Sequence, residues 1–259
     1  KKCFIGPLES MDIQRKLGSD IVMAFDQCPP YPSKKKDVYT DIKRTMYWAK
    51  KCKDFKLSTD QLLFGIIQGG AYQDLRSECA NEIVKLNFHG YAIGGVSVGE
   101  STELILQGID DSIKYLPNNK PRYLMGVGEM SQMIEAIAKG VDMFDCVMPT
   151  RQARNGTVST RKGRYPVKSA IYRNDNRPLE ESCNCETCKR YSRSYIRHLL
   201  NVGEVLGIKL ISYHNIHCYL DFMRDINLAI KENRFHEFRT DFHANYNLVL
   251  NEHIKRIEE

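Results

Sequence analysis

The sequence predicts an α/β protein built on a parallel sheet, either a (β/α)8 barrel or an open doubly wound sheet. Short apolar runs alternate with helical patterns through the first 150 residues, and strands that alternate with helices of this length form βαβ units. Each run also ends in a polar or glycine-rich turn. After Thr150 this pattern stops and a cysteine cluster follows, which indicates a second part of different structure.

The expected strands are the buried apolar runs 21–25, 62–67, 91–93, 123–125 and 143–147. The helical patterns between them cover 38–54, 72–87, 102–115 and 130–139. The turns that follow the strands carry polar residues and glycines: Asp26, Gln68-Gly69-Gly70, Gly94-Gly95, Gly126-Val127-Gly128 and Asp145. Both candidate architectures place such turns together at the carboxyl ends of the strands, where active sites form.

Five strands are too few to close a barrel. The stretch 157–173 is a candidate for another strand, and sequence before residue 1 is expected to supply the rest, because the chain begins without Met. No Gly-x-Gly-x-x-Gly opens a helix after the first strand, which argues against a dinucleotide-binding fold.

The second part begins with a segment that we expect to form a basic turn, residues 150–156, and continues with helical periodicity over 189–201, 204–232 and 234–246. We therefore expect residues 1–155 to hold the barrel elements and the active site. Residues 156–259 are expected to hold the last barrel strand, a metal-binding subdomain and C-terminal helices.

Composition is that of a cored, soluble, cytoplasmic protein. The 38 Lys and Arg against 32 Asp and Glu give a net charge of +6, which permits a polyanionic partner without requiring one. The sequence contains no apolar run long enough to predict a membrane span, and its first residues do not resemble a secretion signal. Nine Cys, an odd number with one tight cluster, favour reduced thiols and a metal site over a disulfide framework.

The most specific local pattern is Cys183-x-Cys185-x-x-Cys188 with His214 further along the chain. Three thiolates and one imidazole suit a tetrahedral zinc ion, and four protein ligands leave no open position, so the zinc would be structural. His217 lies about one helical turn beyond His214 and is an alternative fourth ligand.

The ordered motifs resemble those of the tRNA-guanine transglycosylases. The resemblance runs over about residues 10–245 and rests on the following segments: Met23-Ala24-Phe25-Asp26-Gln27-Cys28-Pro29-Pro30-Tyr31-Pro32, Gly65-Ile66-Ile67-Gln68-Gly69, Gly94-Gly95-Val96-Ser97-Val98-Gly99-Glu100, Tyr123-Leu124-Met125-Gly126-Val127-Gly128, Asp142-Met143-Phe144-Asp145-Cys146-Val147-Met148-Pro149-Thr150-Arg151 and the Cys3-His cluster. The resemblance implies a (β/α)8 barrel with an inserted zinc subdomain and a homodimer.

The resemblance also implies a reaction, in which the wobble guanine of a tRNA anticodon is exchanged for a 7-deazaguanine in queuosine biosynthesis. Asp145 would be the nucleophile that forms a covalent ribosyl intermediate. Asp26 and Gln68 would bind the purine edge, because a carboxylate accepts N–H donors and an amide both donates and accepts.

The remaining base and RNA contacts are expected around these residues. Gly94 and Gly95 would let backbone N–H groups, including that of Val96, approach the base carbonyl, and Met125 would cover one face of the base. The RNA contacts are expected from Gly126, Val127, Gly128, Thr150, Arg151 and Arg154. Cys28 and Val98 match the bacterial pattern in this family, which implies 7-aminomethyl-7-deazaguanine as the incoming base.

One family motif is missing. The family carries an upstream Asp-Ser-Gly-Gly whose Asp acts as general acid and base, and this chain has none. We therefore expect the isolated chain to exchange bases poorly, since loss of such a group typically costs about 10²–10⁴-fold in rate. The alternative is a non-catalytic zinc-containing subunit that binds tRNA or dimerises.

Overall fold

The computed structural model describes residues 2–246 and divides the chain into two compact units, Lys1–Cys146 and Val147–Glu259. The functional division that the sequence suggested, at residues 155 and 156, stays a prediction. Each unit has its own hydrophobic core.

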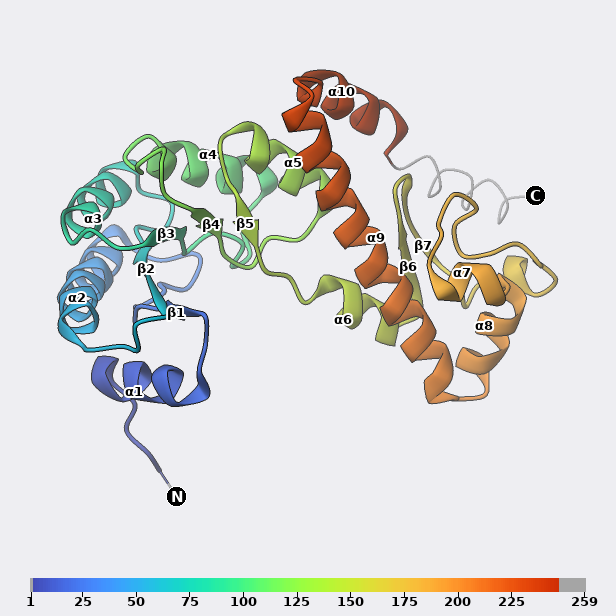
Figure 1. Cartoon of the computed structure of the whole chain (residues 1–259), viewed down its shortest axis with the longest axis horizontal. Coiled ribbons are helices and arrows are strands. Elements are labelled where there is room, and N and C mark those ends of the chain that lie inside the picture. The colour runs from blue at the N-terminus through green and yellow to red at the C-terminus, as the bar shows by residue number, and fades with distance from the viewer. Residues whose placement is uncertain (1, 247–259) are drawn as a thin grey trace. The chain divides into compact units, whose positions relative to one another are not determined.

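The first unit contains five parallel strands in the order in which they follow along the chain. They are β1 (Ile21–Met23), β2 (Leu62–Ile67), β3 (Gly90–Ile93), β4 (Arg122–Leu124) and β5 (Met143–Phe144). Each strand pairs in parallel with the next. An order without reversal is that of a (β/α)8 barrel, because a doubly wound sheet reverses its strand order at a switch point. The sheet is a curled partial barrel, which confirms the predicted fold class (Figure 1).

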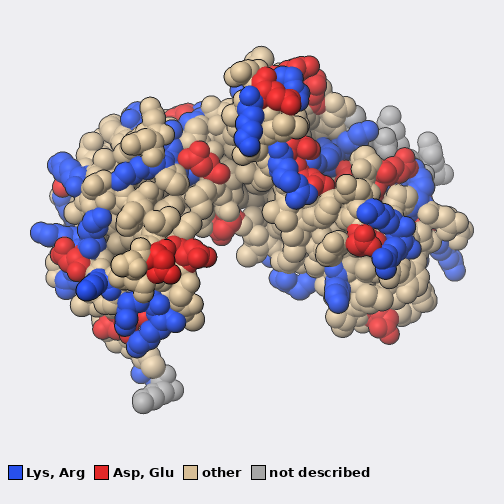
Figure 2. Space-filling model, viewed as in Figure 1, with Lys and Arg blue, Asp and Glu red and all other residues tan. Residues whose placement is uncertain are grey.

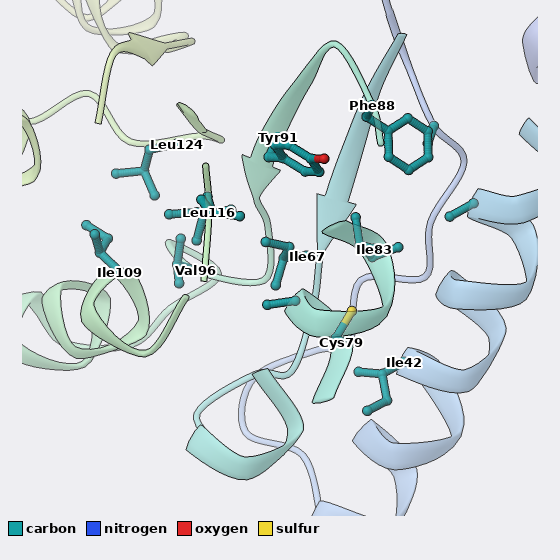
Figure 3. Close-up of a cluster of buried hydrophobic side chains, with 14 of the residues drawn as sticks. Ile42, Ile67, Cys79, Ile83, Phe88, Tyr91, Val96, Ile109, Leu116 and Leu124 are labelled. Carbon is teal, nitrogen blue, oxygen red and sulfur yellow. The ribbon is translucent and has the colours of Figure 1, made fainter. Parts of the chain in front are cut away.

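Four helices connect the strands and cover the outside of the sheet (Figure 1). They are α2 (Lys35–Asp54), α3 (Gln73–Lys85), α4 (Thr102–Ile113) and α5 (Met130–Ala138), close to the predicted ranges. Residues of β3 are all buried and those of β2 nearly so, which is typical of parallel strands covered on both faces. Figure 3 shows the resulting core, in which Ile83 of α3 lies among Ile67, Phe88 and Tyr91 of the sheet region.

The sequence reasoning missed α1 (Pro7–Leu17), which begins with a proline at its first position and covers the edge of the sheet. Gln14 of this helix makes two hydrogen bonds with Met23 of β1. Its amide nitrogen donates to the carbonyl of Met23 at 3.0 Å, and its amide oxygen accepts from the N–H of Met23 at 2.8 Å. A side chain thus takes the place of a neighbouring strand at the exposed edge.

The second unit contains a short hairpin, β6 (Thr157–Thr160) and β7 (Gly163–Pro166), which pair antiparallel with each other. The expectation that 157–173 adds a strand to the parallel sheet is therefore wrong. Only Arg161 and Lys162 separate the two strands, and so short a connection joins antiparallel neighbours, whereas a parallel strand needs a long crossover. The rest of the stretch forms a turn and a 3-10 helix, Ala170–Tyr172.

The helices of the second unit are α6 (Met148–Arg154), α7 (Glu186–Arg190), α8 (Arg193–Asn201), α9 (Val205–Lys231) and α10 (Phe235–Asn245). Of these helices, α6 and α9 pack against the hairpin, and α10 packs against α9. Of the segment expected to be a basic turn, residues 150–154 instead belong to the helix α6, and 155–156 form a turn. Pro149 lies in the first turn of α6, where a missing backbone N–H costs nothing. Within residues 2–246, no helix combines the length and the apolar character needed to cross a bilayer.

Candidate functional site

The carboxyl ends of β1 and β2 meet through Asp26 and Gln68. The Gln68 side-chain amide donates a hydrogen bond of 2.5 Å to Oδ2 of Asp26. Asp26 is half-buried, and burial raises the pKa of its carboxyl, while the hydrogen bond from Gln68 opposes this rise. The two side chains that were predicted to bind the base edge therefore lie in direct contact.

Gln68 is fixed by the glycines that follow β3. Its side chain is 1% exposed, and its Oε1 has no hydrogen-bond partner within the residues that the structure describes. A β-carbon at Gly95 would lie 2.3 Å from that oxygen, and one at Gly94 would lie 2.6 Å from the amide nitrogen. Only glycine leaves room for the amide here, and the buried, unpartnered oxygen is the kind of group that a bound ligand satisfies.

Cys28, Val96 and Val98 take different positions around these loops. The thiol of Cys28 is close to the backbone N–H of Gly95, and burial together with the charge of Asp26 raises the pKa of this thiol. Val96 is 5% exposed and packs into the core. Val98 is 41% exposed.

The ends of β4 and β5 meet at Asp145. The hydroxyl of Tyr123 and the backbone N–H of Gly126 donate hydrogen bonds of 2.6 and 2.8 Å to Oδ1 of Asp145. Both hydrogen bonds that Asp145 accepts from the described residues end on Oδ1. Because Asp145 is exposed, its other oxygen, Oδ2, is free to meet a substrate. Burial and the neighbouring Asp145 carboxylate raise the pKa of Tyr123 above its usual range, so its hydroxyl stays a donor.

A further contact joins the loops after β3 and β4, where the Ser97 hydroxyl donates a hydrogen bond of 3.2 Å to the carbonyl of Gly126. Hydrogen bonds and close packing thus link all five strand ends, from Asp26 to Asp145, along one edge of the sheet. Met125 is half-buried beside Gly126. Gly126 is exposed, whereas Val127 and Gly128 are buried, so Gly126 is the residue of this turn that faces solvent.

The predicted RNA-contacting residues of the second unit lie on α6. Arg151 and Arg154 are both exposed and are three residues apart, which places them on the same side of a helix. Thr150 is half-buried, and its hydroxyl donates to the carbonyl of Val147 at 3.3 Å. On the face of the molecule in Figure 2, basic and acidic side chains are interspersed over each unit, so no RNA surface is delimited by charge on this face.

A buried asparagine of α9 holds α6 and the hairpin. The Asn215 amide nitrogen donates to the carbonyls of Pro149 and Thr157 at 2.9 and 3.1 Å, and its oxygen accepts from the N–H of Ser159 at 2.9 Å. Asn215 is 0% exposed, so all three groups depend on it rather than on water.

The four predicted metal ligands come together in the second unit. One donor atom from each of Cys183, Cys185, Cys188 and His214 lies within 4.8 Å of the others. Nδ1 of His214 lies 3.6, 3.6 and 3.3 Å from the three sulfurs in that order. Ligands of a tetrahedral zinc with Zn–S bonds of about 2.3 Å lie about 3.8 Å apart, so the donor set and its spacing fit structural zinc.

The tautomer of His214 also fits. Its Nε2 donates to the carbonyl of Ser159 at 2.9 Å, which leaves Nδ1 unprotonated and directed at the sulfurs. His217, the alternative ligand, has its Nδ1 3.8 Å from Cys183 and 3.0 Å from a carboxylate oxygen of Asp221. Among the described residues, the clustered set of four contains His214 and not His217.

Three residues that support the site were not singled out from the sequence: Arg76, Tyr123 and Asn215. Tyr123 lies inside a motif used for the resemblance, but nothing in the motif shows that its hydroxyl reaches the next strand. Arg76 stands on the apolar face of α3, between Leu75 and Cys79, and a charged residue at such a position is the signal that could have identified it.

Comparison with known proteins gives a consistent match. A family model described as queuine tRNA-ribosyltransferase matches residues 1–248. A queuine tRNA-ribosyltransferase of Staphylococcus haemolyticus (strain JCSC1435) is 52% identical over 248 residues, covering 95% of this chain and 65% of the relative. One of Staphylococcus aureus (strain JH9) is 50% identical over 248 residues, with the same coverage of 95% and 65%. The chain thus spans 65% of the length of these curated relatives.

Proposed function

The chain belongs to the queuine tRNA-ribosyltransferase family, and from that premise we propose that it exchanges the wobble guanine of a tRNA anticodon for a 7-deazaguanine base. The observation that carries the proposal is the line of contacts along the strand ends. It places a carboxylate held by two donors, Asp145, on the same edge as an acceptor and amide pair, Asp26 and Gln68.

Asp145 is the proposed nucleophile. Its carboxylate attacks C1′ of the ribose, the C1′–N9 bond breaks, and guanine leaves with the electron pair and takes up a proton. The incoming base then attacks C1′ through its own N9, loses the proton there, and displaces the carboxylate, so that two inversions retain the configuration. The hydrogen bonds from Tyr123 and Gly126 to Oδ1 orient the carboxylate for the attack.

Asp26 and Gln68 are the proposed readers of the purine edge. The Asp26 carboxylate accepts N–H donors of the base, and the unpartnered Oε1 of Gln68 provides a further acceptor. The N–H groups of Gly95 and Val96 would donate to the base carbonyl, and Met125 would cover a face of the ring. A base must leave its stack in the anticodon loop to reach such a site.

We further propose 7-aminomethyl-7-deazaguanine as the incoming base, because Cys28 and Val98 leave less room than smaller residues would. On α6, Arg151, Arg154 and Thr150 would contact the tRNA, with Gly126 of the first unit. A homodimer in the cytoplasm, and the roles of Val127 and Gly128 near the RNA, are proposals that rest on the family alone.

The zinc site is proposed to act only as a cross-link. Zinc bound by three thiolates and one imidazole has a closed coordination shell and would tie the segment 183–188 to α9. This chain's own residues, and not the metal, would therefore perform the base exchange.

The second candidate is a non-catalytic tRNA-binding or dimerisation subunit. Slow exchange by the 259 residues taken alone stays a prediction. The positioned Asp145 carboxylate favours catalysis, because binding alone needs no carboxylate held by two donors.

The test is incorporation of radiolabelled guanine into a tRNA with a wobble guanine, with any sequence that precedes residue 1 included in the protein. We expect incorporation and a covalent protein–RNA adduct on denaturing gels, both lost in Asp145→Asn. The matched control is Asp142→Asn, since Asp142 lies at the other end of β5 and accepts from the N–H of Arg122. Binding of tRNA with neither incorporation nor adduct would support the subunit instead.

A further inference from the structure

Arg76 of α3 is a buried cation directed at the loops that follow β2 and β3. Its side chain is 1% exposed. The guanidinium donates to the carbonyl of Gly70 at 2.7 Å, to that of Gly94 at 3.1 Å and to that of Gly95 at 2.9 Å. A fourth bond, at 3.4 Å, goes to the hydroxyl of Ser112. One side chain therefore holds three backbone carbonyls in the two loops that border Gln68.

The guanidinium stays charged in this position. Burial lowers the pKa of Arg76 to about 10, which still leaves it a cation at neutral pH. A buried charge is costly unless hydrogen bonds compensate it, and here carbonyl dipoles do so. Small residues leave the space: a β-carbon at Gly69 would lie 2.6 Å from Arg76, and one at Gly108 would lie 3.4 Å from it.

The hydrogen bonds to the carbonyls of Gly94 and Gly95 also fix the direction of the N–H groups in the same two peptides. In a trans peptide the C=O and the N–H point in opposite directions. The carbonyl of Gly94 shares a peptide with the N–H of Gly95, and the carbonyl of Gly95 shares one with the N–H of Val96. Holding both carbonyls toward Arg76 therefore turns both N–H groups away from it.

Two further observations constrain these two peptides. The thiol of Cys28, two residues beyond Asp26, lies close to the N–H of Gly95. The side chain of Val96 is fixed in the core near Ile109, so the rotation of its peptide is restricted from both ends (Figure 3). The N–H of Gly95 thus faces the side on which Asp26 lies, and the N–H of Val96 points away from Arg76.

We propose that Arg76 is a positioning residue for base selection, which fixes the N–H groups of Gly95 and Val96 so that they recognise a purine with a carbonyl at position 6. The inference rests on the proposed function, since it assigns a role in the same base-binding site. Arg76 would not touch the base; it would act through the two peptides.

The test compares guanine with 2-aminopurine, which lacks the carbonyl oxygen, by calorimetric binding to wild type and Arg76→Met. Loss of Arg76 should lower the preference for guanine about tenfold, the effect of about one hydrogen bond, while 2-aminopurine binding stays nearly unchanged. A defect of general stability would weaken both purines equally. This pairing of variant and ligand isolates the interaction with the carbonyl.

Arg122→Met is the matched control. Arg122 also donates to backbone carbonyls, those of Leu116 and Gly140, but at the amino end of β4, so the preference for guanine should remain. If Arg76→Met does not fold, Arg76→Lys carries the test, because a lysine keeps the charge but reaches fewer carbonyls, and an intermediate preference is expected.

The outcomes separate the two claims. Wild type that prefers guanine, with the same preference in the Arg76 variants, overturns the role of Arg76 and leaves the proposed function standing. Wild type that binds neither purine and incorporates no guanine overturns the proposed function and this inference with it.

Discussion

The hydroxyl of Tyr123 lies 2.6 Å from Oδ1 of Asp145, so the last two strands of the sheet are joined at the carboxylate that we propose as nucleophile. The strands β4 and β5 pair Tyr123 with Met143, which brings the tyrosine beside the end of β5. The carboxylate is thereby oriented by a neighbouring strand as well as by the adjacent turn.

Replacing Tyr123 by Phe should slow the base exchange. In Tyr123→Phe one charge-assisted hydrogen bond is lost, and we expect guanine incorporation to fall about tenfold. Tyr47→Phe is the control, because Tyr47 is exposed on α2. The measurement is the rate of guanine incorporation under single-turnover conditions. An unchanged rate in Tyr123→Phe would show that the Tyr123 hydroxyl does not assist the reaction.

Gly95→Ala should abolish base binding by displacing Gln68. The added methyl would lie 2.3 Å from Oε1 of Gln68, on a residue with φ of 62°. Gly18→Ala is the control, because Gly18 has φ of 69° but nothing within 4 Å of the added carbon. Both variants carry backbone strain of roughly 1 kcal/mol or more in urea unfolding, and only Gly95→Ala should lose guanine in calorimetry.

Asp26→Asn should weaken guanine binding and stabilise the folded protein, the second effect only at neutral pH. Burial raises the pKa of Asp26 in the folded protein above its value of about 3.9 in the unfolded chain. The protonated carboxyl therefore stabilises the folded state fully below the unfolded pKa, and this stabilisation is lost as the pH rises through the folded pKa. At pH 7 the buried charge therefore costs stability. We expect Asp26→Asn to melt higher than wild type at pH 7 and to lose this advantage near pH 4, while guanine binding falls at both.

Melting curves across this range, with Asp60→Asn as an exposed control, provide the measurement. A constant difference in melting temperature between Asp26→Asn and wild type from pH 4 to 8 would show that the pKa of Asp26 is not raised by burial.

Removal of the metal should unfold the second unit locally. We expect one zinc per chain by elemental analysis, lost in Cys188→Ser together with several kcal/mol of stability. Cys218→Ser is the control, since Cys218 is a buried thiol of α9 outside the cluster of four. Full zinc content in Cys188→Ser would show that another residue, such as His217, completes the site.

The positions of the strands along the chain and the membership of the metal cluster could be predicted because both depend on local patterns. Buried apolar runs marked the strands, and the spacing of Cys183, Cys185 and Cys188 marked the ligands. The spatial order of the strands in the sheet could not be predicted from these runs, since an open and a closed sheet share the same alternation. The hairpin after Gly156 was misassigned because a run of strand formers does not say which partner it pairs with.

The supporting contacts could not be predicted, because they join residues far apart in the chain. Arg76 reaches carbonyls 18 and 19 residues away, and Asn215 reaches a carbonyl 66 residues away. Backbone carbonyls carry no residue identity, so no sequence pattern announces such a contact. The proposed readers of the base could be inferred from their chemistry, whereas of the residues that hold them only Arg76 left a signal, as a charge on the apolar face of α3.

His214 and Asn215 are consecutive on α9, and both bind the backbone of Ser159, one through its carbonyl and the other through its N–H. The same asparagine holds Pro149 at the start of α6. In a cell short of zinc, the helix that presents Arg151 and Arg154 would therefore loosen while the strand ends of the first unit stayed intact. Under the proposed function, such a protein would still recognise the free base but would release its RNA, so metal supply would decide whether a correctly folded base site is put to use.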